Sequence, residues 1–96
     1  MTANNKRVVV ITGLGAVTPI GLNAAESFQA ALDGVCGIAP ITAFDTTDSK
    51  VKLAAEVKGF DADALLGKRE VRRMDRFTQF ALAAAAEAVQ DSALDM

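Results

Sequence analysis

Apolar residues along the chain follow two different patterns, and each predicts a strand. The first is a continuous, largely β-branched run at Val8–Thr12, which Gly13 ends. An unbroken apolar run of this length is typical of a strand buried on both faces. The second lies at Val51–Val57, where apolar and polar residues alternate. Because successive side chains of a strand point to opposite faces, this alternation predicts a half-buried strand with Leu53 and Ala55 on its buried face.

The first predicted helix covers Ala24–Asp33 and has signals at both ends. Asn23 is suited to cap its start, Glu26 stands three residues later as in a capping box, and Gly34 is a suitable left-handed stop. The stretch that follows, residues 37–49, contains Gly, Pro and a cluster of Asp, Thr and Ser. A stretch rich in these turn-forming residues predicts a surface loop.

Two more helical segments are predicted in the second half of the chain. Asp61 caps a short helical turn through Leu66, Gly67 ends it, and a long helix follows over Lys68–Ala93. Within that helix Phe80–Ala86 is apolar on every face, so it requires packing inside a larger body. Two strands and two principal helices do not supply enough surface to cover this segment, and a two-stranded sheet is only marginally stable. The pattern therefore predicts the front part of a larger α/β domain.

Composition narrows the function classes. The chain is 51% hydrophobic and 23% charged with a formal net charge of -2, as in an ordinary globular domain, so its bulk charge indicates no partner. The longest apolar run has seven residues and the amino terminus lacks a signal-peptide core, which favours a cytoplasmic protein without a membrane span. One cysteine and no histidine leave neither an intramolecular disulfide, a metal site nor a Cys-His pair. We expect no catalytic residue in these 96 positions.

The glycines after the first predicted strand raise the question of a nucleotide-binding loop. Gly13 and Gly15 match the first two glycines of a dinucleotide fingerprint, but Thr18 occupies the third position. The helix signals begin only at Asn23, too late to direct amide groups at a phosphate. A P-loop fails because Leu22 stands where lysine is required. A nucleotide-binding α/β domain stays as an alternative, and tight turns with close backbone approach are the structural interpretation of the glycines.

Basic residues cluster at the start of the predicted long helix. Helical spacing places Arg69, Arg72, Arg73 and Arg76 on one face, with Lys68 beside them. Like charges four residues apart, next to the positive end of a helix, are locally unfavourable. A solvated basic face is one interpretation, and an anionic partner that relieves the strain is the other. A nucleic-acid module is a weaker alternative, since the chain is net acidic and no aromatic residue lies between the arginines.

Four segments together resemble a known family. They are "VVVITGLGAVTPIG", "SFQAALDGVCGIAPITAFD", "AAEVKGFD" and "REVRRMDRFTQFALAAAAEAVQDSAL". In this order and spacing they are similar to the amino-terminal segment of the β-ketoacyl-acyl-carrier-protein synthase II family of condensing enzymes. Polyketide-type ketosynthases and chain-length factors share the opening, so they stay as alternatives within the same superfamily.

The resemblance implies a thiolase-like α/β fold, of which residues 1–96 would form the amino-terminal portion of the first half only, as an incomplete β-ketoacyl synthase domain. It implies a homodimer that extends fatty acids by decarboxylative Claisen condensation and uses no cofactor beyond the phosphopantetheine of acyl carrier protein. The family's cysteine nucleophile and two histidines match no position here, so the chain alone is expected to be inactive. Cys36 falls where the family has a small residue, and a buried or half-buried structural thiol is expected.

The resemblance also gives the basic cluster a partner. In the family, basic residues at this helix start dock the acidic acyl carrier protein, and by position they match Arg69, Arg72 and Arg73. Lys68 is a neighbour in the same patch, and Arg76 is expected to serve a packing or ion-pair role instead. No nucleic-acid or membrane partner is implied.

Overall fold

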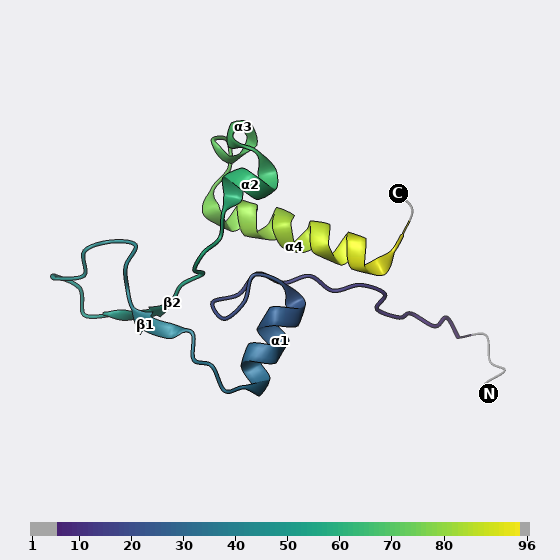
Figure 1. Cartoon of the computed structure of the whole chain (residues 1–96), viewed down its shortest axis with the longest axis horizontal. Coiled ribbons are helices and arrows are strands. Elements are labelled where there is room, and N and C mark those ends of the chain that lie inside the picture. Colours follow the sequence, from purple (N-terminus) through teal and green to yellow (C-terminus); the bar gives the residue numbers. More distant parts are fainter. Residues whose placement is uncertain (1–5, 95–96) are drawn as a thin grey trace.

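The computed structural model describes residues 6–94, so residues 1–5 and 95–96 of the predicted 1–96 domain lie outside the described residues. Figure 1 shows an elongated arrangement in which the longest helix lies beside the opening segment of the chain. The Cα radius of gyration is 17.8 Å, against about 13 Å for a compact domain of this size. The elements in order are α1 (Ala24–Leu32), β1 (Ile38–Pro40), β2 (Leu53–Ala55), α2 (Ala62–Leu66), α3 (Lys68–Val71) and α4 (Arg76–Ser92).

Helix α1 forms as its end signals predict, to within one residue. The Asn23 side chain accepts a hydrogen bond from the Glu26 amide at 2.8 Å, while the Glu26 carboxylate reaches back to accept from the Leu22 amide at 3.3 Å. Gly34 follows the helix with φ +75°, in the left-handed region that favours glycine. The capping box and the glycine stop are both confirmed.

The short helix α2 also has its predicted ends. Asp61 accepts a hydrogen bond from the Ala64 amide at 3.2 Å, and Gly67 ends the helix with φ +88°. This positive φ turns the chain directly into α3, which begins at Lys68. The sequence thus places the start of the basic cluster correctly.

The single long helix predicted over Lys68–Ala93 is wrong, because the chain breaks between Val71 and Arg76. Asp75 has an extended backbone, φ -73° and ψ 162°, and precedes α4 as its N-cap residue. A continuous helix would stack like charges at four-residue spacing, and the break separates them. The far end is close to the prediction, since Ala93 with φ 57° ends α4.

The sheet contains an antiparallel pair, β1 with β2, in which Ile38 pairs with Ala55 and Pro40 with Leu53. β1 corrects the prediction of a loop over residues 37–49, because its strand conformation depends on pairing with β2 rather than on a local pattern. β2 lies inside the predicted strand but is shorter, and its faces are reversed: Ala54 is half-buried while Leu53 and Ala55 are exposed. Within residues 6–94 little packs on the Leu53 face, which explains the reversal.

The predicted strand at Val8–Thr12 is wrong for the described residues, which assign no strand there. Its side chains are exposed, and Val9 is 91% exposed. A strand needs a neighbour to take its backbone hydrogen bonds, and residues 6–94 supply none to this segment.

The most buried side chains among the described residues lie where α2 meets the first turn of α4. Phe60 is 8% exposed, Ala62 and Gln79 are each 7% exposed, and no other residue of 6–94 is classed as buried. This small core fixes the chain on either side of the basic cluster. None of the helices within residues 6–94 has the length and apolar character to cross a membrane.

Candidate functional site: an exposed arginine turn

Four basic residues at the break between two helices form the candidate site, which we call the arginine turn: Lys68, Arg69, Arg72 and Arg73. The first two belong to α3, Arg72 caps its end, and the Arg73 amide donates to the Glu70 carbonyl at 3.0 Å. All four side chains are exposed, and within residues 6–94 their charged groups have no hydrogen-bond or ion-pair partner. The turn therefore presents four positive charges to solvent, none of them in an ion pair within residues 6–94.

The break changes the electrostatics that the sequence predicts. Arg72 and Arg73 lie at the carboxyl end of α3, where a helix carries partial negative charge that favours cations. The local strain predicted for one continuous helix is therefore reduced.

Arg76 does not belong to the arginine turn, which corrects the prediction of one shared face. Its guanidinium carbon lies 5.1 Å from the ring centroid of Phe60 and 4.9 Å from that of Phe80. The two rings meet edge to face at 5.0 Å, with an interplanar angle of 80°. Of the packing and ion-pair roles expected for Arg76, the structure confirms packing, through cation–π contacts.

Gln79 connects the first turn of α4 to the arginine turn. Its buried side-chain amide donates a hydrogen bond to the Met74 carbonyl at 3.3 Å. Met74 follows Arg73 directly, so this bond fixes the end of the turn. Gln79 is not predicted as a site residue from the sequence. The only signal for it there is its place as a polar residue, next to Thr78, between Phe77 and Phe80.

The opening glycines lie against α4 and not around a ligand. A Cβ added at Gly13 would come 2.2 Å from the Ala88 carbonyl oxygen, and one at Gly15 would come 1.9 Å from that of Ala84. Real Cβ atoms do not approach so closely, so both positions require glycine for backbone-to-helix contact. The interpretation of close backbone approach is confirmed.

Two carboxylates of α4 occupy the amide groups that a phosphate would need. Glu87 accepts from the Ala16 amide at 2.9 Å and from the Ala24 amide at 3.0 Å, and Asp91 accepts from the Leu14 amide at 3.0 Å. Glu87 thereby supplies negative charge at the start of α1, where the helix dipole favours it. The amides of the loop are already paired with negative charge, which excludes a phosphate cradle there and corrects the nucleotide-binding alternative. Sequence analysis missed Glu87, although it is an isolated charge in an otherwise apolar stretch of helix.

Replacing Glu87 by glutamine is expected to lower the free energy of unfolding by about 1–2 kcal/mol, because the neutral amide keeps one acceptor and loses the charge-assisted bonds. Urea unfolding of the complete protein measures the change. Glu70→Gln is the matched control, since the Glu70 side chain is exposed and has no partner within residues 6–94. Equal stability of the two variants would contradict the assigned role of Glu87.

Cys36 is exposed, which corrects the expectation of a buried or half-buried thiol. Its Sγ lies 4.0 Å from the Ile38 carbonyl oxygen, a weak contact. The loop after α1 leaves it uncovered because little packs on that loop within residues 6–94. The geometry offers no base or helix amino terminus to activate it. Among the described residues no group of three His, Cys, Asp or Glu side chains is arranged to hold a metal ion.

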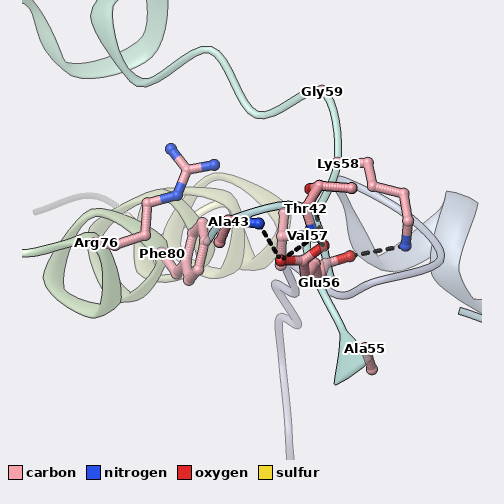
Figure 2. Close-up of a pocket in the computed structure, with 9 residues that line it drawn as sticks. All are labelled: Thr42, Ala43, Ala55, Glu56, Val57, Lys58, Gly59, Arg76 and Phe80. Atoms are coloured by element: carbon pink, nitrogen blue, oxygen red, sulfur yellow. Dashed lines mark hydrogen bonds between the residues drawn. The ribbon is translucent and has the colours of Figure 1, made fainter. Parts of the chain in front are cut away.

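A cavity of about 630 Å³ lies between the strand region and α4 (Figure 2). On one wall Glu56 accepts from the Thr42 amide at 3.0 Å and from the Ala43 amide at 3.1 Å, and the Thr42 bonds above all hold the pKa of Glu56 below its ordinary value. Lys58 donates to the Glu56 carbonyl at 2.8 Å, and Arg76 with Phe80 forms the other wall. These polar groups are occupied within the chain, so the cavity has the features of a structural junction.

The sequence of the chain matches a known protein family. The sequence model of the family described as "Beta-ketoacyl synthase, N-terminal domain" matches residues 6–96. The chain is 51% identical over 94 residues to a 3-oxoacyl-[acyl-carrier-protein] synthase 2 of Staphylococcus aureus strain COL, covering 98% of this chain and 22% of the relative. It is 46% identical over 89 residues to a 3-oxoacyl-[acyl-carrier-protein] synthase 2 of Synechocystis, covering 93% of this chain and 21% of the relative.

A solved structure has the same arrangement of elements. It is described as the ishigamide ketosynthase/chain length factor, and it is 35% identical to this chain with a TM-score of 0.79. The match covers 90% of this chain and 21% of that one. The fold is therefore that of the amino-terminal portion of a thiolase-like ketosynthase. The chain spans about a fifth of the length of the relatives that it matches.

Proposed function

The chain belongs to the β-ketoacyl synthase family, and we propose that the complete protein is a 3-oxoacyl-acyl-carrier-protein synthase that extends fatty acyl chains. The observation that carries this proposal is the 51% identity over nearly the whole chain to proteins named as such synthases. Residues 1–96 would then be the amino-terminal part of one β-ketoacyl synthase domain. The remaining four-fifths of such a polypeptide would cover the apolar residues that stand exposed here, such as Val8–Ile11.

The proposed reaction is a decarboxylative Claisen condensation. An acyl group is first held as a thioester on a cysteine outside this segment. The bond from the malonyl methylene carbon to its carboxylate then breaks, carbon dioxide leaves, and the electron pair forms a carbon–carbon bond to the acyl carbonyl. The cysteine leaves as thiolate, which makes this covalent catalysis with stabilisation of a thioester enolate. Cys36 takes no part, and no cofactor is needed beyond the phosphopantetheine of the carrier.

The part proposed for this segment is docking of acyl carrier protein on the arginine turn. Four exposed cations without partners inside residues 6–94 fit an acidic surface that carries a phosphodiester. Arg69, Arg72 and Arg73 would form the patch and Lys68 its margin. Arginine suits this role because its planar group binds carboxylate or phosphate through two parallel hydrogen bonds. We further expect a cytoplasmic homodimer without nucleic-acid partners.

A second candidate is a polyketide-type ketosynthase or chain-length factor. It is favoured by the 35% identity and TM-score of 0.79 to the ishigamide ketosynthase/chain length factor. It ranks second because the identity to 3-oxoacyl-[acyl-carrier-protein] synthase 2 is higher, 51% against 35%. A chain-length factor would lack condensing activity by itself, which separates the two candidates in one assay.

The assay mixes the purified complete protein with an acyl carrier protein loaded with a saturated acyl chain and with malonyl carrier protein. The expected result is release of carbon dioxide together with a 3-oxoacyl carrier protein two carbons longer, seen by mass spectrometry. Protein without this activity, or active only together with a second ketosynthase subunit, would contradict the proposal and favour the chain-length factor.

A further inference from the structure

Two side chains in the first turn of α4 contact residues on either side of the arginine turn, and neither is part of the docking patch. The Arg76 guanidinium packs against the rings of Phe60 and Phe80, 5.1 and 4.9 Å from their centroids. Gln79 donates to the Met74 carbonyl at 3.3 Å. Phe60 precedes α2 and Met74 follows Arg73 directly, so these contacts lie on both sides of the segment that carries the basic residues.

We propose that Arg76 and Gln79 are positioning residues that hold the arginine turn at a fixed angle on α4, so that its guanidinium groups meet an acidic carrier protein together. This inference rests on the proposed docking function and deepens it. It divides the five basic residues of positions 68–76 into two roles. Four present charge to a partner, and Arg76 fixes the surface that carries them.

The arginine turn needs such support because its own secondary structure is weak. α3 has four residues and its start lacks a side-chain cap. A helix that short does not form stably by itself, so its orientation depends on contacts with neighbours. Gln79 supplies one such contact from inside the protein, since its side chain is 7% exposed and its amide reaches the Met74 carbonyl.

Arg76 is suited to positioning because its charge is directed to aromatic faces. The Phe60 ring is 8% exposed and stands edge to face with Phe80, so the two rings form a fixed surface on which the guanidinium packs. A cation over two rings favours one geometry of the chain that precedes it. Fixing the turn in advance lowers the entropic cost of docking, which strengthens binding without a new contact to the partner.

A double-mutant cycle in the complete synthase tests this inference. Gln79→Met keeps the side-chain volume and removes the bond to Met74, and we expect it to raise the KM for carrier-protein substrates about three- to tenfold. The kcat and the KM for a small pantetheine thioester should stay unchanged. When Arg72 and Arg73 are both alanine, Gln79→Met should cause a clearly smaller rise, because much of its effect passes through those two residues.

Substitution of Arg76 tests the positioning role independently, because it does not change a buried residue. Arg76→Gln should raise the KM for carrier-protein substrates about two- to fivefold, and Arg76→Lys should restore most of it because an ammonium also binds aromatic faces. Gln90→Met is the control for Gln79, since Gln90 is exposed on the same helix. Lys50→Gln is the control for the lost charge, since Lys50 is an exposed cation outside the arginine turn.

The outcomes separate the inference from the docking function. An equal rise in both backgrounds, an equal loss with the small thioester, or no effect of Gln79→Met and Arg76→Gln would overturn the positioning role while docking stands. If the Arg72→Ala and Arg73→Ala variant itself leaves the carrier-protein KM unchanged, the docking function is contradicted, and the inference that rests on it is overturned as well.

Discussion

In the complete synthase, replacement of both Arg72 and Arg73 by glutamate is expected to raise the KM for acyl carrier protein substrates about 10- to 100-fold. Two attractive charge pairs become repulsive, and both side chains are exposed with no competing partner within residues 6–94. The kcat should change little, because the arginine turn holds no reacting group. Steady-state kinetics with purified carrier-protein thioesters measure the effect.

Two comparisons make this result specific for docking. A small pantetheine thioester has no acidic surface, so its KM should stay within about twofold of the wild-type value. Salt should weaken the wild-type interaction and leave the variant less affected, because exposed charge pairs are screened. Lys50→Glu, a reversal at an exposed cation of the loop between β1 and β2, should leave both substrates unaffected. An equal loss for the carrier-protein and small substrates would contradict docking at this turn.

Substitution of Gly15 by alanine is expected to destabilise the protein by about 3 kcal/mol or more, because overpacking against backbone leaves no side chain able to move aside. The added Cβ would lie 1.9 Å from the Ala84 carbonyl oxygen and 2.8 Å from the Ala88 amide nitrogen. The opening segment would have to leave α4, and its hydrogen bond from Ala16 to Glu87 would break. Urea unfolding and the yield of folded protein measure the loss.

The matched control for Gly15 is Gly34→Asn. Gly34 has nothing within 4 Å of an added Cβ, and its φ of +75° is one that asparagine tolerates. A cost within about 0.5 kcal/mol is expected for it. If Gly15→Ala were as mild as Gly34→Asn, the contact between the opening segment and α4 would be wrong.

Local signals predicted those parts of the fold that depend on neighbouring residues. Asn23 and Glu26 define the start of α1, and Asp61 with Gly67 defines both ends of α2, because capping is decided within one turn of helix. The sequence also correctly predicts that glycines of the opening segment allow close approach of the backbone to another element. What they approach, α4, lies more than 65 residues away and has no local signal.

Features that depend on residues far away in the chain are not predicted by local sequence patterns. Val8–Thr12 has the composition of a buried strand, yet strand structure requires a paired neighbour that residues 6–94 lack. The contact of Arg76 with Phe60, a residue that precedes α2, likewise has no local signal in the sequence. For the candidate site, the sequence supplied the four cations and the resemblance supplied a partner. Only the structure shows that Arg76 packs on Phe60 and Phe80, a contact that Arg72 does not make.

Docking of acyl carrier protein on the arginine turn is tested most directly by a cryo-electron microscopy structure of the complete protein with acyl carrier protein bound. We expect carboxylate or phosphate oxygens of the carrier within about 4 Å of the guanidinium groups of Arg72 and Arg73, the distance of an ion pair. Arg76 should stay packed against Phe60 and Phe80 in that complex. A carrier protein bound elsewhere, with residues 68–73 open to solvent, would contradict the account.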